Sequence, residues 1–317
     1  MLDAETVLRQ SRRPLVIGMG GGGDVVGALA TAELGRRYDG SEPILGGLAW
    51  ERRPIDPLPG PRNPEEIEHG EEVAPGVMLA SAQTRVRDRE VYFAESRMAE
   101  FLGEPTVLIT LDQGPATIAS SLDQVARELE RDLLVFIDVG GDVLAQGHEP
   151  GLRSPLGDAI MLAVAARLLE AGHPVLGGIF GIGCDGELTP GEVLDALSEL
   201  AGAGGLAGAR GLTDPVARRL EEAIRLIPTE ASAHAVSAFR NPAGTAPIRG
   251  GVRSIERTAA ASVTFYFDVS VAYERLGRLA QAVNGAADLE EANDALHALG
   301  VHSELDLERE AVKLAAG

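Results

Sequence analysis

The sequence predicts an α/β protein with a doubly wound, mostly parallel sheet of the Rossmann-like type and a C-terminal helical extension. Short apolar runs alternate with segments whose apolar residues recur at helical spacing, and four of the runs end in loops that contain glycine and an acidic residue. Strands that are apolar along their whole length are typical of parallel sheets covered by helices on both faces. We expect residues 1–228 to form the α/β core. Residues 229–317 are expected to form a mixed, mainly helical part, either separate or packed on the core as a single domain.

Each predicted element has a local signal in the sequence. An apolar run at residues 14–19 leads into four consecutive glycines and then into apolar residues at helical spacing, which predicts a strand, a tight turn and a helix. A capping box with proline just inside, Thr189-Pro190-Gly191-Glu192, marks the start of a later helix. The same criteria predict further strands at residues 106–111, 133–137 and 174–180, and less regular ones at 43–50, 76–82 and 260–267. They predict helices at residues 24–34, around 122–129, from 154, from 189, and at 213–227, 268–283, 289–299 and 304–315.

The segment from residue 53 to residue 75 interrupts this alternation. It contains six prolines and five glutamates and has no apolar periodicity. We therefore expect a long surface loop, and long loops inside compact domains are often functional. A lid over the site is one function that this loop could have.

The composition excludes several classes of protein. The chain carries 28 Lys and Arg against 48 Asp and Glu, for a net charge of −20, so nucleic acid is not an expected partner. Lys313 is the only lysine, which argues against pyridoxal enzymes, class I aldolases and P-loop kinases. Cys184 is the only cysteine, so an intramolecular disulfide and a cysteine-rich zinc site are excluded. The sequence has no apolar stretch of about 18 residues and no apolar leader, so we expect a cytoplasmic protein that does not enter a membrane.

The glycine- and acid-containing loops predict the position of a site. In open parallel sheets, ligands bind beyond the carboxyl ends of the strands, and the loops at residues 20–24, 112–115, 138–142 and 181–187 are expected at that edge. The predicted catalytic residues are Asp138, Asp142 and Asp185. A divalent cation such as Mg²⁺ or Mn²⁺ would bind Asp138, Asp142 and Glu187, because these ions prefer carboxylate oxygens. Residues expected to bind the substrate or its anionic group are Gly20, Gly21, Gly22, Gly23, Asp24, Asp112, Gly140, Gly141 and Ser154.

Each of these predictions has a purely structural alternative. The glycine run can serve tight packing between strand and helix, and the aspartates can cap helices or form turns. Gly18, Gly20 and Gly23 fit the spacing of a dinucleotide fingerprint. The second predicted strand, however, ends at Trp50-Glu51 with arginines after it, which is not where an acid that holds the ribose is expected, so NAD is weakly supported. Arg52 and Arg53 could supply the cation that the acidic loops lack, or they could be ordinary surface arginines.

Three segments in order resemble a known family. They are Ile17-Gly-Met-Gly-Gly-Gly-Gly-Asp24-Val-Val-Gly27, then Ile137-Asp-Val-Gly-Gly-Asp142 with its continuation to Asp158, and Gly183-Cys-Asp-Gly-Glu-Leu188. Together they resemble the family called domain of unknown function 1152, and the resemblance covers most of the chain. It implies that these loops belong together, and it carries over no catalytic residue because the family has no assigned reaction.

We expect an enzyme that acts on a small phosphorylated or carboxylated metabolite, such as a nucleotide or sugar derivative. Transferase and lyase chemistry rank equally with hydrolysis. The alternative is a non-catalytic binding or sensor protein that uses the same pocket, favoured by the lack of any complete catalytic motif. A homo-oligomer could form through the apolar helices after residue 260, although core packing explains them equally well.

Overall fold

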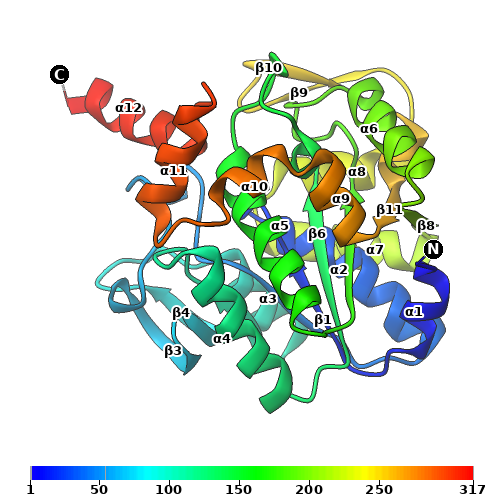
Figure 1. The fold of residues 1–317 in the computed structure, drawn as a ribbon, viewed down its shortest axis with the longest axis horizontal. Helices are drawn as coiled ribbons and strands as arrows, with labels where there is room; N and C mark the ends of the chain where they lie inside the picture. The colour runs from blue at the N-terminus through cyan, green and yellow to red at the C-terminus, as the bar shows by residue number, and fades with distance from the viewer. Residues whose placement is uncertain (1, 54, 317) are drawn as a thin grey trace.

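The computed structural model describes residues 2–53 and 55–316 and has a doubly wound α/β fold (Figure 1). A nine-stranded sheet has the order β3-β4-β5-β2-β1-β6-β7-β11-β8, and the strands β5, β2, β1, β6 and β7 at its centre are parallel. The central strands are β1 (Pro14–Gly18), β2 (Ile44–Leu48), β5 (Thr106–Ile109), β6 (Leu133–Val139) and β7 (Val175–Phe180). The outer strands are β3 (Ile67–Ala74), β4 (Val77–Val86), β8 (Leu206–Gly211) and β11 (Val263–Phe267).

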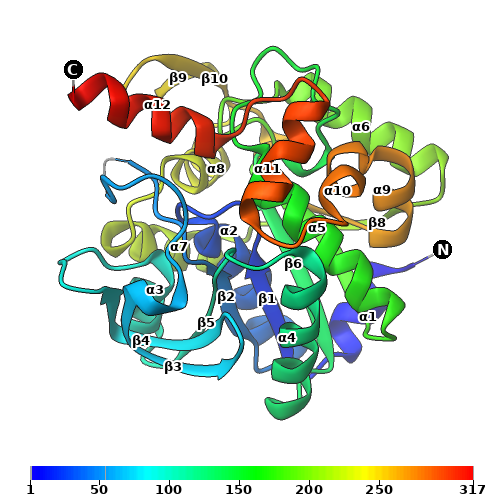
Figure 2. The same cartoon turned by 60° about the vertical axis from the view of Figure 1, so that its left-hand side comes forward.

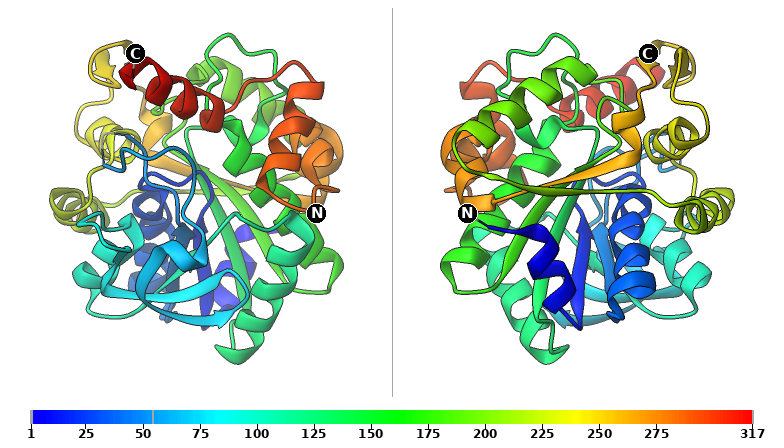
Figure 3. Two further views of the ribbon diagram at one scale, coloured as in Figure 1. Left: turned by 90° about the vertical axis from the view of Figure 1, so that its left-hand side faces the viewer. Right: turned by 90° about the vertical axis from the view of Figure 1, so that its right-hand side faces the viewer.

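Helices cover both faces of the sheet (Figures 1 and 3). The side chains of successive strand residues point to opposite faces, so Leu15 and Ile17 belong to one apolar core and Val16 to the other. The first core packs against α4 (Pro115–Glu128), α5 (Pro155–Glu170), α9 (Val269–Leu276) and α10 (Arg278–Val283). The second packs against α2 (Asp24–Leu34) and α7 (Asp214–Leu226). Burial on both faces explains why the central strands are apolar throughout.

The remaining helices and a small hairpin complete the fold. Helix α12 lies beside the hairpin in Figure 2, above the edge of the sheet where the central strands end. The helices are α1 (Ala4–Gln10), α3 (Ala94–Leu102), α6 (Pro190–Gly202), α8 (Glu230–Arg240), α11 (Leu289–Ala298) and α12 (Glu304–Ala316). The hairpin is formed by β9 (Thr245–Ile248) and β10 (Arg253–Glu256), and Asp142–Leu144 form a 3₁₀ turn after β6.

The prediction of a long loop at residues 53–75 is wrong for its second half. Strand β3 occupies Ile67–Ala74 and pairs antiparallel with β4 at the edge of the sheet. An edge strand exposes several of its side chains to solvent and therefore needs no apolar periodicity. The glutamates of β3 for this reason made the segment resemble a loop in the sequence. In the first half, the buried Arg62 guanidinium lies 3.3 Å from the Asp56 carboxylate. Pro54 lies outside the described residues.

The C-terminal part contributes a strand to the main sheet. Strand β11 runs antiparallel between β7 and β8, so residues on both sides of position 228 share one sheet. The single helix expected at residues 268–283 is two helices, α9 and α10, that meet at Gly277. A Cβ atom at Gly277 would lie 2.4 Å from the carbonyl oxygen of Tyr273, so only glycine permits this close turn. Helix α8 and strands β8, β9 and β10 were not predicted.

None of the described helices combines the length and the apolar character that crossing a membrane requires.

Candidate functional site

The carboxyl ends of β1 and β6 lie where the strand order reverses. The chain places β2 on one side of β1 and β6 on the other, so the loops that follow β1 and β6 diverge from a shared crevice. Doubly wound sheets bind ligands at such a switch point. A cavity with a volume of about 40 Å³ lies there, and we call it the acid cavity. This is room for about three waters or a cation with some of its waters. Its glycine and acidic lining residues include Gly20, Gly21, Gly22, Asp24, Asp142, Asp158 and Asp185.

The glycine run takes a backbone conformation that other residues rarely adopt. Gly21, Gly22 and Gly23 have φ angles of 73°, 60° and 107°, all in the left-handed region. The amide of Gly20 donates a 3.0 Å hydrogen bond to the Asp24 carboxylate, so this amide is already occupied. The amide of Gly22 donates to the carbonyl oxygen of Trp50. An anion bound at this loop would therefore lie near the Asp24 carboxylate. The amides of Gly20 and Gly22 would not be free to donate hydrogen bonds to it.

Aspartates from four further segments of the chain lie at the cavity or directly beside it. Asp138 lies in β6, Asp142 begins the 3₁₀ turn, Asp158 lies in the first turn of α5, and Asp185 follows β7, all at most 5% exposed. One oxygen each from Asp138, Asp142 and Asp158 lie within 4.8 Å of one another. Asp142, Asp185 and Glu187 form a second such group, so Asp142 belongs to both. A cation between these oxygens would have carboxylate ligands from three or more segments of the chain.

Several of these buried oxygens have no hydrogen-bond partner among the described residues. They are Oδ1 of Asp138, Oδ1 of Asp158 and both carboxylate oxygens of Asp185. Burial raises the pKa of Asp138 to about 7. Burial and the nearby Asp138 raise the pKa of Asp24 to about 8. Unpaired buried carboxylates are costly, and a divalent cation would both supply partners and favour the ionised form.

Glu187 has a different environment from the aspartates. Its carboxylate accepts hydrogen bonds from the Ser154 hydroxyl at 2.5 Å and from the amides of Ser154 and Arg153 at 2.8 and 2.6 Å. These bonds hold Glu187 against the residues that lead into α5, whose first-turn amides at Leu156 and Gly157 donate to Glu304 instead. A cation ligated by Glu187 would compete with these three hydrogen bonds. Asp158, with an unpartnered oxygen, is the better placed ligand.

Glycine at position 140 permits the approach of Asp185. Gly140 has a φ angle of 138°, and a Cβ atom there would lie 2.4 Å from the carboxyl carbon of Asp185. Gly141 packs closely against Val193, where an added Cβ atom would lie 2.5 Å from Cγ2 of the valine. These two glycines therefore shape the cavity without lining it.

Positive charge gathers beside the acid cavity. Arg52 donates a 2.6 Å hydrogen bond to the carbonyl oxygen of Gly20, stacks over the Trp50 ring at 4.3 Å, and lies 3.4 Å from Glu304 and 3.6 Å from Glu308 of α12. An adjoining groove, which we call the arginine groove, shares Arg52, Ser154 and Arg249 with the cavity. Its five arginines are Arg52, Arg53, Arg153, Arg249 and Arg253.

Three of these arginines have no carboxylate partner in the described part of the chain. The guanidinium groups of Arg153 and Arg253 donate only to backbone carbonyl oxygens among the described residues, and Arg53 is exposed and forms no ion pair within residues 2–53 and 55–316. Glu187, Glu304 and Glu308 also line the groove, so its arginines outnumber its acidic residues by two, in a chain whose net charge is −20. Guanidinium groups in this number favour a phosphate or carboxylate ligand.

The structure brings most of the residues predicted for the site together. Gly20, Gly21, Gly22, Asp24, Asp142, Ser154 and Asp185 line the cavity, and Asp138 is buried beside Asp142. Gly23 instead faces Thr229, whose Cβ atom would be 2.8 Å from a Cβ at that position. Asp112 is not among the lining residues of this described cavity, and it is hydrogen-bonded to Thr110 and Gln113.

Sequence reasoning missed residues that the fold brings to the site from a distance. Asp158 follows Ser154 by four residues at the start of a predicted helix, so its position at the edge could have been inferred. Thr229 and Arg249 come from the C-terminal part, and no local signal links them to the glycine run.

The family comparison covers all of these residues. The family model described as "Protein of unknown function (DUF1152)" matches residues 15–312, from β1 to α12. The chain belongs to this family. The matched range includes every residue of this DUF1152 protein that lines the acid cavity or the arginine groove. Searches of curated proteins and of solved structures gave no match.

Proposed function

We propose that this DUF1152 protein is an enzyme that acts on a small phosphorylated or carboxylated metabolite in the acid cavity, with a divalent cation such as Mg²⁺ or Mn²⁺. The observation that carries the proposal is the set of buried carboxylate oxygens without hydrogen-bond partners at the switch point of the sheet. Uncompensated carboxylates destabilise a fold, so their presence in one cavity supports a role in binding a cation.

Asp138, Asp142, Asp158 and Asp185 are the proposed cation ligands. Asp142 belongs to both groups of three carboxylates and would be the common ligand. The bound cation would polarise a phosphoryl or carbonyl oxygen of the substrate or activate a water molecule. A carboxylate that does not bind the cation would remain available to accept or donate a proton.

The arginine groove supports an anionic substrate. It opens from the acid cavity at Arg52 and Arg249, so a ligand could place its anionic group among the arginines and its reacting bond near the cation. A nucleotide or sugar derivative has both parts. Transfer, lyase and hydrolytic reactions all fit this arrangement. NAD stays weakly supported, because Asp24 occupies the Gly20 amide that a pyrophosphate would use.

Cation binding provides the first test. We expect Mn²⁺, titrated into metal-free protein and measured by electron paramagnetic resonance, to bind to the wild type and at least about tenfold more weakly to Asp158→Asn and Asp185→Asn. Asp112→Asn is the matched control, because this aspartate follows a neighbouring strand but does not line the cavity. Equal Mn²⁺ affinity in all four proteins would show that the carboxylates bind no cation.

Turnover provides the second test. We expect incubation with Mn²⁺ and a panel of nucleotides and sugar phosphates, followed by ³¹P nuclear magnetic resonance and mass spectrometry, to show a changed compound with the wild type and none with Asp158→Asn. Arg53→Gln should weaken binding of that compound without changing the affinity for Mn²⁺. Arg127→Gln is the control on the exposed surface of α4, where its partner is Asp123.

A non-catalytic ligand sensor is the second candidate function. The contacts of Glu304 and Glu308 with Arg52 link α12 to the rim of the site, so a ligand that recruits Arg52 would loosen that helix. Tight binding of a compound that is recovered unchanged would favour the sensor over the enzyme. We also propose that the protein works in the cytoplasm, which the single, free and buried Cys184 supports. We further propose that it has no nucleic-acid partner, which its net charge of −20 supports, and that it forms a homo-oligomer.

A further inference from the structure

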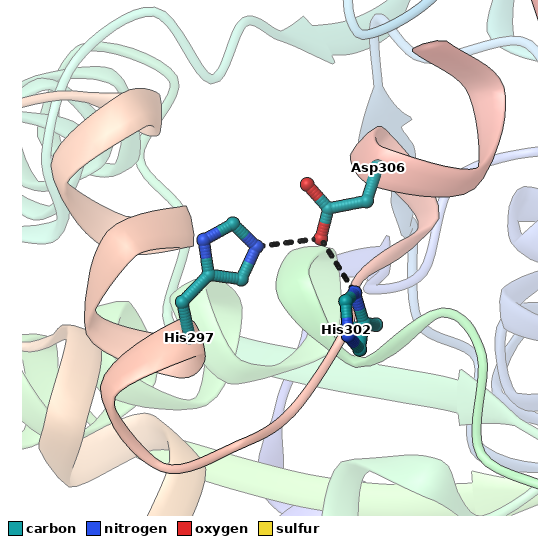
Figure 4. A group of neighbouring side chains, drawn as sticks. All are labelled: His297, His302 and Asp306. Carbon is teal, nitrogen blue, oxygen red and sulfur yellow. Dashed lines mark hydrogen bonds and ion pairs between the residues drawn. The ribbon is translucent and has the colours of Figure 1, made fainter. Parts of the chain in front are cut away.

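A second group of potential metal ligands lies outside the acid cavity, between α11 and α12. His297 is in the last turn of α11, His302 is in the connection, and Asp306 is in the first turn of α12. Figure 4 shows both imidazole rings directed at one oxygen of the Asp306 carboxylate. Oδ2 of Asp306 lies 2.7 Å from Nε2 of His297 and 4.0 Å from Nδ1 of His302. One ligand atom from each residue lies within 4.8 Å of the others.

Buried polar residues fix the orientation of the Asp306 carboxylate. The side-chain amide of Asn293 donates a 3.0 Å hydrogen bond to its Oδ1 atom, and the hydroxyl of Ser303 donates to the Oδ1 atom of Asn293. Asn293 and Ser303 are 2% and 0% exposed, so the pair is held by the core. This arrangement holds Oδ1, while Oδ2 faces the histidines and also accepts from the hydroxyl of Ser303 at 3.3 Å.

Part of this network has an ordinary structural role. The amide of Ser303 donates a 3.0 Å hydrogen bond to Oδ2 of Asp306, which helps to cap α12. Capping explains Asp306 and Ser303, but it requires neither histidine. His302 is 78% exposed in its side chain and has no capping contact among the described residues, yet its ring lies 5.9 Å from that of His297 between centroids. The second ring nitrogen of His297 lies 3.7 Å from the exposed Asp294 carboxylate, which is beyond hydrogen-bond distance and leaves the orientation of the ring to Asp306.

We propose that His297, His302 and Asp306 form a binding site for a divalent transition metal, with Zn²⁺ as the ion of best fit. Two imidazoles and one carboxylate are typical ligands of Zn²⁺, whereas Mg²⁺ and Mn²⁺ prefer oxygen ligands alone. Small rotations of the two exposed rings bring their nitrogens to one point, and water completes the coordination. This site is separate from the acid cavity and does not rest on the function proposed for it.

Metal binding here would fasten the N-terminal end of α12. The first two turns of that helix carry Glu304 and Glu308. Glu304 accepts from the amides of Leu156 and Gly157, Glu308 accepts from the Trp50 indole, and both lie near Arg52. A cation that links α11 to α12 therefore stabilises the helix that covers the arginine groove. The expected effect is greater resistance of the C-terminal helix to proteolysis when Zn²⁺ is present.

The test uses the full chain without a histidine tag. Zn²⁺ affinity is measured by competition with a chromophoric chelator, and Cu²⁺ is used as a spectroscopic probe of nitrogen ligands. We expect His302→Ala and His297→Ala each to weaken Zn²⁺ binding at least about tenfold and to remove the signal of one nitrogen from the Cu²⁺ spectrum. His148→Ala is the control, since His148 lines the adjoining cavity with His302 but is not in the cluster.

The result that overturns the proposal is equally direct. Wild-type Zn²⁺ affinity in both His297→Ala and His302→Ala, or no Zn²⁺ binding at micromolar concentration, would show that the cluster only caps α12. Asp185→Asn separates this site from the acid cavity. It should leave Zn²⁺ binding with two nitrogen ligands intact, and loss of that binding in Asp185→Asn alone would place the metal in the acid cavity instead.

Discussion

Glu51 offers a stability test whose magnitude follows from its environment. Its carboxylate is 3% exposed and accepts a 2.6 Å hydrogen bond from the amide of Ala94, at the start of α3. Burial raises the pKa of Glu51 from 4.5 to about 7, against the opposing effects of the Ala94 amide and Arg52. We predict that Glu51→Gln stabilises the protein at alkaline pH, because glutamine keeps the hydrogen-bond acceptor and removes the charge.

The sign and size follow from the two pKa values. Because the folded pKa is the higher one, the folded state holds the proton more tightly, and stability falls as the pH rises from 4.5 through about 7. At about 1.4 kcal/mol for each pKa unit, ionised Glu51 costs the folded state about 3 kcal/mol above pH 7. Glu51→Gln should therefore match the wild type near pH 4.5 and exceed its free energy of unfolding by about 3 kcal/mol at pH 8.

Urea unfolding at pH 5 and pH 8, followed by circular dichroism in buffer with a metal chelator, measures the difference. The control is Glu90→Gln, which changes an exposed glutamate in the loop that leads into α3. A stability difference between the wild type and Glu51→Gln that is the same at both pH values would refute the reasoning. It would show that Glu51 is ionised equally easily in the folded and unfolded chains.

Three further predictions test the packing of the core and its helix starts. Gly27→Ala places a Cβ atom 2.2 Å from Cγ2 of Val139 and should lower the free energy of unfolding by about 1–3 kcal/mol in urea titrations, whereas Gly202→Ala, with open space around it, should not. Thr189→Ala removes the capping hydroxyl of α6 and should cost about 1 kcal/mol in the same assay; no change would mean that the cap is dispensable. Burial raises the pKa of the Cys184 thiol to about 12, so we expect it to react with an aromatic disulfide reagent only after unfolding, and rapid reaction of the native protein would contradict this.

The positions of the central strands and their helices could be read from the sequence because their signals are local. A strand buried on both faces must be apolar throughout, as at residues 133–137. The capping box at Thr189 indicates the start of α6. Edge strand β3 lacks such a signal because only its end residues, Ile67 and Ala74, are buried and the six between them are partly or fully exposed. Strand β8 is rich in alanine and glycine, and it pairs with β11 only through contacts between distant segments.

The candidate site divides in the same way. Glycine and aspartate in one loop imply a tight turn with a carboxylate at the end of a strand, and the order of strands and helices alone places such loops at one edge of the sheet. The sequence therefore predicted that Gly20–Asp24, Asp138–Asp142 and Asp185 belong to one region. It also included Asp112, because the local pattern after β5 is the same as after the strands at the switch point.

Only the tertiary structure decided which of these loops share a cavity and which charges meet there. The strand order puts β6 between β1 and β7, whereas β1 and β2 separate β5 from β6, so Asp112 lies apart from the aspartates that follow β6 and β7. Arg249 reaches the cavity from the hairpin, and Glu304 of the last helix reaches Arg52 at the rim of the cavity. Backbone preference and burial are properties of a short segment, whereas the meeting of charges depends on pairing between segments more than a hundred residues apart. That pairing is set by the free energy of the whole fold.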